Sequence, residues 1–143
     1  MSVVRAEPAY ATVVAELYRQ CFPDVWKEAD IQKILMLPTT VLWVSEKGFL
    51  LCSHVLDEME IISIGVLPAY RRQHFGSSFL KEMMDYANQN DVKKIFLEVS
   101  VENSPAQALY HQFGFTESGT RKNYYKTKNG FVDALCLIKQ IKP

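Results

Sequence analysis

The stretch that decides the fold is EIISIGVLPAYRRQHFGSSFL, residues 60–80. Its first part, residues 60–67, is an almost continuous apolar run rich in isoleucine, which is typical of a strand covered on both faces. Pro68 ends that strand because it cannot donate to a sheet ladder. Residues 75–87 then place apolar side chains on one stripe and charged side chains opposite, which predicts an amphipathic helix. The sequence therefore predicts a buried strand, a tight loop and a covering helix.

The next apolar segment is KIFLEVSV, residues 94–101, which predicts a second strand. A strand, a helix and a second strand in this order require a right-handed crossover and a parallel strand pair. A further helix is expected directly afterwards, since Ser104 is placed to cap it and Gln107 follows three residues on. Pro105 suits its first position and Gly114 its end.

The rest of the chain predicts two N-terminal helices and further antiparallel strands. The expected segments are a strand at 3–6, a helix after Pro8, a helix at 28–37, strands at 41–46 and 49–56 around a turn at Lys47-Gly48, and strands at 115–125 and 131–141 around a turn at 128–130. No repeat or linker divides them. We therefore expect one domain, residues 1–143, of the α/β class, with helices packed on a mixed sheet.

Composition excludes several classes of protein. A chain of 143 residues with 48% hydrophobic side chains suits one core. Sixteen basic residues balance sixteen acidic ones, which argues against wholesale binding to nucleic acid or to an anionic membrane. Three widely spaced cysteines indicate a reduced intracellular protein without a zinc knuckle. No apolar run approaches the roughly 20 residues that cross a bilayer, so we expect a soluble, cytoplasmic protein.

The segment at residues 71–77 contains a loop and the first turn of the predicted helix, which begins after residue 74. First-turn amides of a helix lack intrahelical partners and carry the positive end of the macrodipole, which favours an anion. Arg71 and Arg72 add charge, Gly76 permits close backbone approach, and Ser77 offers a hydroxyl. This combination suits a phosphate or pyrophosphate, although a solvated basic turn has the same composition.

Gly65 lies inside the preceding strand, where a glycine weakens pairing. Such a glycine marks a bulge, or a place where a ligand lies against the backbone, or a tight packing contact. A bulge at Gly65 would splay this strand from its parallel neighbour. The resulting slot would open at the carboxyl ends of the strands, where open α/β sheets bind ligands.

Two residues have side chains suited to proton transfer. Glu98 is a carboxylate in the middle of a strand that should be buried, and desolvation disfavours its ionised form, which suits a general base. An ion pair or a solvent-facing position explains Glu98 equally well. Tyr110 lies on the apolar face of the third helix, where its phenol suits either a general acid for a leaving thiolate or core packing. Asn103 is placed to hold a ligand amide or to shape the turn, and the histidines lack metal-ligand spacing.

Together these segments resemble the GNAT superfamily of acetyl-CoA-dependent N-acetyltransferases, over essentially the whole chain. The loop, Arg71-x-x-His74-x-Gly76, is similar to the family's Arg/Gln-x-x-Gly-x-Gly/Ala. The resemblance implies a mostly antiparallel sheet with a splayed central parallel pair and helices on both faces. It also implies acetyl-CoA as cosubstrate, no metal, and loop amides around the coenzyme pyrophosphate. The positions implied for coenzyme binding are Ile64, Gly65, Val66, Arg71, Arg72, Gln73, His74, Phe75, Gly76, Ser77 and Asn103.

Within that superfamily the chain most resembles the RimI-type enzymes, which acetylate the N-terminal alanine of a ribosomal protein. LEVSVENSPAQALYHQFGF, residues 97–115, and RKNYYKTKNGFVDAL, residues 121–135, are similar to two of their segments, and CFPDVWKEADI, residues 21–31, is similar to their acceptor loop. The resemblance implies Glu98 as general base and Tyr110 as general acid. The implied acceptor-groove residues are Phe22, Trp26, Tyr124 and Tyr125. A small amine or a protein lysine is an alternative acceptor, and a module that binds acetyl-CoA without turnover is an alternative function.

The chain departs from the family pattern at three positions. His74 stands where the family usually has glycine, so either the loop accepts a side chain there or the coenzyme sits differently. Histidine is among the residues that tolerate left-handed backbone, which favours retained coenzyme binding. Leu67 and Val132 each replace a common acidic residue.

Overall fold

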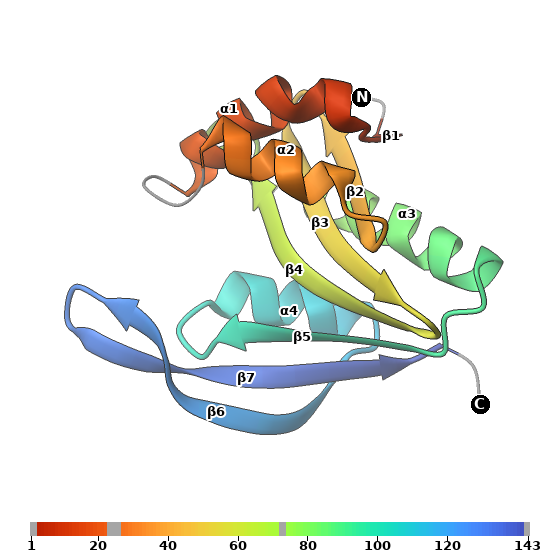
Figure 1. The fold of residues 1–143 in the computed structure, drawn as a ribbon. Coiled ribbons are helices and arrows are strands. Elements are labelled where there is room, and N and C mark those ends of the chain that lie inside the picture. Colours follow the sequence, from red (N-terminus) through yellow and green to blue (C-terminus); the bar gives the residue numbers. More distant parts are fainter. Residues whose placement is uncertain (1–2, 23–26, 72–73, 142–143) are drawn as a thin grey trace.

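The computed structural model describes residues 3–22, 27–71 and 74–141. Within these ranges the chain forms a seven-stranded mixed sheet in the order β1-β2-β3-β4-β5-β7-β6, with helices on both faces (Figure 1). The elements are β1 (Val4–Arg5), η1 (Pro8–Tyr10), α1 (Ala11–Cys21), α2 (Glu28–Met36), β2 (Thr40–Ser45), β3 (Gly48–Val55), β4 (Glu58–Val66), η2 (Pro68–Tyr70), α3 (Phe75–Gln89), β5 (Lys94–Ser100), α4 (Ser104–Gln112), β6 (Thr116–Thr127) and β7 (Gly130–Gln140). The expected fold class is confirmed.

The parallel pair of the sheet is β4 and β5, and it separates part-way along. Pairing runs from Glu58 opposite Lys94 to Ile61 opposite Leu97. Both strands then continue without pairing to each other, β4 to Val66 and β5 beyond Leu97. Figure 1 shows the two halves of the sheet diverging from this point. The splayed parallel pair expected from the sequence is therefore confirmed.

The irregularity that accompanies the splay lies at Ile62. The register between β3 and β4 shifts between Leu51 and Cys52, which leaves Ile62 as the extra residue of a β-bulge. Because of this extra residue, Ile61 and Ile64 both pack on the core beneath α3. The bulge therefore changes the alternation of β4, so that Ile64 faces the same side of the sheet as Ile61, the side covered by α3.

Two glycines of this region lie where a side chain would overlap neighbouring atoms. Gly65 pairs regularly with Phe49, so of the alternatives considered for Gly65 the bulge is absent. A Cβ on Gly65 would lie 2.6 Å from Phe49 Cε1, which identifies a packing contact. Gly48, expected in the β2–β3 turn, is the first residue of β3, and a Cβ there would lie 2.2 Å from the Gly65 carbonyl oxygen. Both positions lack a side chain because neighbouring atoms occupy its place.

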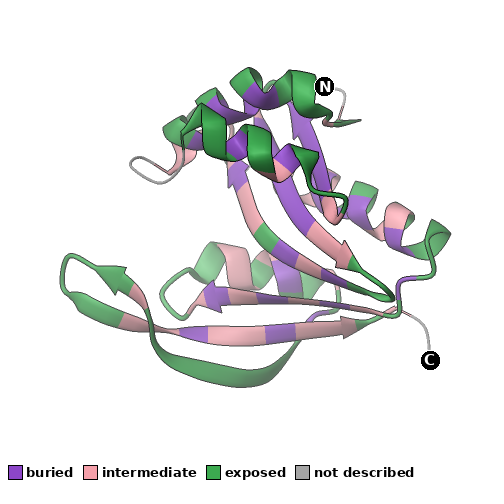
Figure 2. Ribbon diagram, in the orientation of Figure 1, coloured by how far each residue is buried: buried purple, intermediate pink, exposed green. Residues whose placement is uncertain are grey.

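The sheet separates two apolar cores. Figure 2 shows buried residues along β2 and β3 beneath α1 and α2, whereas β6 is exposed except at the half-buried Tyr125. On the other face α3 buries the stripe predicted for it, including Phe79 and Met83. On α1 the buried side chains include Val14 and Leu17, whereas Val13 is exposed. No helix in the described ranges is long and apolar enough to span a bilayer.

Candidate active site

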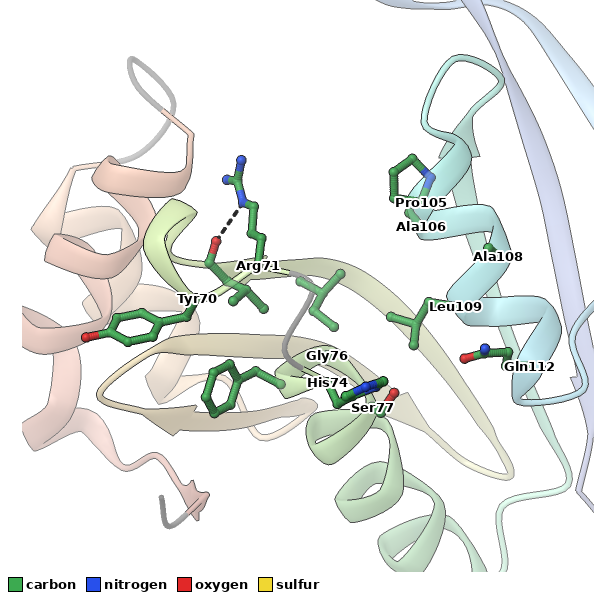
Figure 3. A pocket seen from close by; sticks show the side chains of 13 residues that line it. Tyr70, Arg71, His74, Gly76, Ser77, Pro105, Ala106, Ala108, Leu109 and Gln112 are labelled. Carbon is green, nitrogen blue, oxygen red and sulfur yellow. Dashed lines mark hydrogen bonds between the residues drawn. The ribbon is translucent and has the colours of Figure 1, made fainter.

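A cavity of about 550 Å³ lies between β4, the start of α3 and α4, on the face of the sheet opposite α1 (Figure 3). Its apolar walls are contributed by the end of β4 and by α4, and its polar end by the η2–α3 loop. The lining residues are Ile64, Val66, Tyr70, Arg71, His74, Phe75, Gly76, Ser77, Pro105, Ala106, Ala108, Leu109 and Gln112. A cavity of this size and mixed character suits an elongated ligand with an anionic group at one end.

The start of α3 is the polar feature of this cavity. The backbone N–H of Ser78 donates to the His74 carbonyl at 3.2 Å, so the amides of Phe75, Gly76 and Ser77 precede the first intrahelical bond. No side chain of the described residues caps this helix. The uncapped amides and the positive end of the helix dipole therefore favour an anion in the cavity.

His74 has the left-handed backbone that the sequence led us to expect. Its φ is 67° and its ψ is 18°, which is ordinary for glycine and uncommon for other residues. This conformation turns the chain from the loop into α3. Histidine therefore adopts the left-handed backbone expected to be tolerated at this position, and retained coenzyme binding stays a prediction.

Cations lie close to the same end of the cavity. Arg71 Nε donates to the Val66 carbonyl at 3.0 Å, which fastens the loop to the end of β4 (Figure 3). The Lys47 ammonium lies 4.7 Å from the ring centre of Tyr70 and 4.9 Å from that of Phe75. These positive groups add to the attraction that the helix terminus exerts on an anion.

The predicted coenzyme positions other than Asn103 fall into three groups. Those that line the cavity are Ile64, Val66, Arg71, His74, Phe75, Gly76 and Ser77. Gly65 packs on the opposite face of the sheet against Phe49. Arg72 and Gln73 lie outside the described residues.

Asn103 forms the cap of α4. Its Oδ1 accepts the backbone N–H of Ala106 at 3.2 Å, so Asn103 is the N-cap and the prediction of Ser104 as the cap is wrong. Ser104 is the first helical residue, one position later than a cap. The asparagine side chain therefore orients the helix that forms the far wall of the cavity.

The far wall is the part of the cavity that the sequence did not reveal. The residues missed are Tyr70 and the α4 residues Pro105, Ala106, Ala108, Leu109 and Gln112. The order of the strands and helices along the sequence could have revealed this wall. Helix α4 begins directly after β5, the parallel partner of β4, so both helices start at the same splayed edge of the sheet.

Glu98 lies on the other face of the sheet and is held by an ion pair. Its Oε1 accepts a hydrogen bond from Arg121 Nη1 at 2.7 Å. Its Oε2 is buried and has no hydrogen-bond partner among the described residues. The hydroxyl of Tyr125 donates to the Glu98 carbonyl at 3.2 Å. The ion pair considered for Glu98 is present, and it leaves one carboxylate oxygen without a partner.

A bulge in β6 brings the partners of Glu98 into place. The register of β6 and β7 shifts between Arg121 and Tyr125, and Asn123, with φ of 54°, donates its N–H to Asp133 Oδ1 at 2.9 Å. The Arg121 guanidinium lies 4.7 Å from the centre of the Tyr124 ring. The Glu98 carboxylate raises the pKa of Tyr124, and burial raises the pKa of Tyr125 to about 12. Both phenols therefore stay protonated at neutral pH.

Tyr110 lies in the core on the α3 side, 4% exposed, with its ring centre 5.7 Å from that of Phe115. Burial raises the pKa of its phenol above the ordinary value. Because side chains alternate along β5, Glu98 points away from the core that contains Leu97 and Tyr110. The Glu98 carboxylate and the protonated Tyr110 phenol therefore lie on opposite faces of the sheet.

The predicted acceptor-groove residues are only partly brought together. Tyr124 and Tyr125 lie beside Glu98. Phe22 instead packs in the core beneath α1, with its ring centre 5.2 Å from that of Tyr18. Trp26 lies outside the described residues. No group of His, Cys, Asp and Glu in the described ranges could hold a metal ion.

Comparison with known protein families identifies the family to which this chain belongs. Residues 11–115 match the model of the acetyltransferase (GNAT) family. The chain belongs to the GNAT family. As a GNAT protein it is an acetyl-CoA-dependent N-acetyltransferase, and it is similar to characterised members along most of its length.

Two bacterial relatives of this GNAT protein are similar in sequence. The [ribosomal protein bS18]-alanine N-acetyltransferase of Escherichia coli strain K12 is 38% identical over 94 residues, which span 66% of this chain and 64% of the relative. A Bacillus subtilis relative, provisionally named for the same reaction, is 35% identical over 130 residues, 87% of this chain and 85% of its own length.

Solved structures share the GNAT fold. The ribosomal-protein-S18-alanine N-acetyltransferase of Escherichia coli superposes with a TM-score of 0.91 at 26% identity, covering 99% of this chain and 94% of that one. Arabidopsis thaliana NAA60 in complex with acetyl-CoA superposes with a TM-score of 0.86 at 17% identity, covering 98% of both chains. The second likeness supports the fold of this GNAT protein.

The residues of the cavity fit the cosubstrate of a GNAT enzyme. The uncapped start of α3 suits a pyrophosphate, and the apolar walls from β4 and α4 suit a slender acyl-bearing arm. At Gly76 a Cβ would lie 3.0 Å from Leu109 Cδ2, so the glycine lets the start of α3 lie close to α4.

Proposed function

We propose that this enzyme acetylates the N-terminal alanine of a ribosomal protein or of a similar peptide. The observation that supports the mechanism is the placement of Glu98 and Tyr110 on opposite faces of the sheet beside the splay. The names of the Escherichia coli and Bacillus subtilis relatives support the choice of acceptor. In this proposal the cosubstrate enters from the α3 side and the peptide from the α1 side.

The cavity would hold the cosubstrate along its length. The amides of Phe75, Gly76 and Ser77 would bind the pyrophosphate, with Arg71 adding positive charge. The arm that carries the acetyl group would lie along Ile64 and Val66, which line the cavity on the splayed end of β4. This places the thioester beside the gap between β4 and β5.

Glu98 would accept the proton of the acceptor amine, directly or through a water molecule. Arg121 occupies Oε1, which leaves the unpartnered Oε2 for this role. An N-terminal amine has an unperturbed pKa of about 8, compared with about 10.4 for lysine, so a modest base can supply the neutral nucleophile. The ease of deprotonation therefore favours an N-terminal acceptor.

The neutral amine would then attack the thioester carbonyl carbon. A C–N bond forms, the C–S bond breaks, and the electron pair of that bond leaves on sulfur. Tyr110 would give its proton to the departing thiolate, and the new amide nitrogen would lose its surplus proton to water. A proton returning from the solvent would restore the Tyr110 phenol, and Glu98 would release to the solvent the proton that it took from the ammonium before the attack. Burial keeps the Tyr110 phenol protonated, and the same desolvation makes a buried thiolate more basic.

Mass spectrometry of peptides after incubation with the enzyme and acetyl-CoA tests the acceptor. We expect a single acetyl group on the α-amine of an Ala-starting ribosomal peptide, and none on the same peptide with a blocked amino terminus. Polyamines and lysine-containing blocked peptides serve as competitors. If kcat/KM were about tenfold higher on one of these than on the Ala-starting peptide, the proposed acceptor would be wrong.

Two isosteric substitutions test the mechanism. Tyr110→Phe should lower kcat by about 10²-fold with little change in the affinity for acetyl-CoA, since general acid catalysis contributes about that much. Glu98→Gln should lower kcat similarly and change its pH profile. Tyr10→Phe, at an exposed position of η1, and Glu102→Gln, exposed after β5, are the matched controls. Unchanged kcat in Tyr110→Phe would exclude Tyr110 as the acid.

A further inference from the structure

We propose that the His74 side chain, when protonated, binds the pyrophosphate of the coenzyme, so that this enzyme holds acetyl-CoA more tightly as the pH falls. The inference rests on the proposed function, because it takes the pyrophosphate to lie against the amides at the start of α3. The family's usual glycine has no side chain at this position. The response to pH would therefore come from the histidine that this chain carries instead.

His74 directly precedes the amides that would hold the pyrophosphate. Its left-handed backbone leads into Phe75, the first residue of α3. Its side chain is exposed and lines the cavity together with Ser77. Figure 3 shows the ring of His74 at the α3 end of the cavity, across from Pro105 of α4. An anion held by the first amides of α3 would therefore lie next to this imidazole.

The fold leaves the ring of His74 free to bind a ligand. The hydrogen bonds of His74 within the described residues go to its backbone carbonyl, from the Ser78 N–H at 3.2 Å and from Ser78 Oγ at 3.3 Å.

The other two histidines of the chain use their rings within the fold. Nδ1 and Nε2 of His54 lie 2.7 Å from the Tyr86 hydroxyl and 2.8 Å from the Leu56 carbonyl oxygen. Nδ1 of His111 lies 3.0 Å from the Phe115 carbonyl oxygen. His74 is thus the histidine whose ring nitrogens stay available among the described residues.

The groups around His74 supply no negative charge. The titratable side chains among the described lining residues are Tyr70, Arg71 and His74, and the parts of β4 and α4 that line the cavity carry no charge. No acidic residue lies in the first turn of α3. Lys47, beside Tyr70, is a further cation. An imidazolium at position 74 therefore meets no carboxylate in this lining, and an anionic ligand would be the group that stabilises it.

Arg71 is directed away from the start of α3. Its Nε donates to the Val66 carbonyl at 3.0 Å, and Figure 3 shows the guanidinium near the end of β4. Burial raises the pKa of the Cys21 thiol at the end of α1, and the neighbouring Arg71 guanidinium opposes that rise. Among the described lining residues, His74 is therefore the ionisable side chain next to the α3 amides.

The chemistry of imidazole gives the direction of the effect. A histidine side chain ordinarily changes its charge between pH 5 and 8. The protonated ring has two N–H donors and a positive charge, whereas the neutral ring has one donor and one acceptor. A pyrophosphate that links two alcohols stays fully ionised throughout this range. Because the bound state would hold more protons than the free state, the affinity would rise as the pH falls.

The effect would be on binding and not on the chemical step. Acetyl-CoA and the product CoA carry the same pyrophosphate, so His74 would stabilise both. Such uniform binding lowers the KM for acetyl-CoA and leaves the acetyl transfer itself unchanged.

The test uses dephospho-CoA, which keeps the pyrophosphate but lacks the 3′-phosphate. A phosphate monoester titrates near pH 6, so this probe removes the titration of the ligand itself. Calorimetry from about pH 5.5 to about pH 8, in two buffers that differ in ionisation enthalpy, gives the dissociation constant and the number of protons taken up. The proteins are the wild type, His74→Asn, His74→Gly and the control His111→Gln. Asparagine and glycine both tolerate left-handed backbone, so the fold of the loop is kept.

We expect the wild type to bind dephospho-CoA about threefold more tightly at the acidic end of this range, as for a solvent-exposed ion pair. Such a change corresponds to uptake of at most about 0.3 proton per ligand. His74→Asn and His74→Gly should lose both effects and match the wild type at about pH 8, where the imidazole is neutral. His111→Gln should behave as the wild type does. With CoA as the ligand, the difference between wild type and His74→Asn should be the same as with dephospho-CoA.

The failure of this inference differs from that of the proposed function. Equal pH dependence and proton uptake in the wild type and His74→Asn would overturn the role of His74, and so would an equal loss in His111→Gln. A difference seen with CoA but not with dephospho-CoA would overturn the pyrophosphate as the partner of His74. If the wild type bound neither acetyl-CoA nor CoA at any pH, the proposed function would fall together with this inference.

Discussion

The substitution Gly65→Ala tests the packing that positions the splayed strand. The new Cβ would lie 2.6 Å from Phe49 Cε1 and 3.1 Å from Cys21 Sγ, both closer than carbon normally approaches these atoms. The Phe49 ring cannot yield easily, since it is fully buried and stacks on Tyr18 with ring centres 5.1 Å apart. Overpacking of this kind costs about 1–3 kcal/mol.

The expected effect on thermal stability follows from the chain length. An unfolding entropy of about 2.1 cal/mol/K per residue gives about 0.3 kcal/mol/K for the whole chain, so each kcal/mol lowers Tm by about 3 °C. We expect Gly65→Ala to lower Tm by about 3–10 °C in differential scanning calorimetry. Gly119→Ala is the matched control, because a Cβ on Gly119 of β6 meets no atom within 4 Å.

A double substitution separates steric overlap from other causes. Phe49→Leu removes the ring atoms that the new methyl group of Gly65→Ala would meet, so the pair of substitutions should be less destabilising than the sum of the two changes by about 1 kcal/mol. If Gly65→Ala had the same Tm as Gly119→Ala, or if the two effects simply added, the packing role of Gly65 would be refuted.

Substitutions at three further positions test the α4 cap, the backbone at His74 and the cation near the start of α3. Asn103→Ala should lower the free energy of unfolding by about 1 kcal/mol because the α4 cap is lost, whereas Asn103→Asp should retain the cap. Equal urea midpoints for the two variants would contradict a capping role for Asn103. His74→Val should lower the free energy of unfolding by about 1–2 kcal/mol, because a β-branched residue is strained in left-handed backbone, while His74→Gly should change it little. Coincident denaturation curves of the two variants would contradict this backbone requirement at position 74. Lys47→Met should weaken acetyl-CoA binding in calorimetry by about threefold at low salt, whereas Lys47→Arg should not, and equal affinities would exclude a role for this cation.

The fold was predicted correctly where apolar residues recur with the period of a helix or a strand and one side of that element is buried. Phe79, Leu80 and Met83 recur at helical spacing and are buried on α3. The alternation of residues 94–101 recurs in the burial of β5, where Glu98 lies on the less buried face. These patterns depend on neighbours a few residues away, so the sequence alone could supply them.

The position of the bulge in β4 could not be predicted in this way. Ile62 lies in an apolar run with no glycine or polar residue to mark it, and its unpaired state depends on the register against β3. Gly65 carried the local signal for a bulge but serves a contact with Phe49, a residue of another strand. Both outcomes are set by pairing between strands, which a single strand does not encode.

The environment of Glu98 shows the same limit. The sequence marked Glu98 as unusual but left an ion pair and a desolvated base equally open. The guanidinium that forms the ion pair belongs to Arg121, 23 residues further on, beside the register shift of β6, and the role of Glu98 as a base stays a prediction. The α4 wall of the cavity was missed for a related reason, because apolar residues such as Leu109 suit a core and a ligand cavity equally well.

A crystal structure of the enzyme with acetyl-CoA tests the central claim most directly. We predict that the pyrophosphate lies against the amides of Phe75, Gly76 and Ser77, and that the acetyl group lies in the gap beyond Ile61 and Leu97. A complex with the coenzyme bound away from the start of α3, or with its acetyl group outside the gap between β4 and β5, would contradict this account.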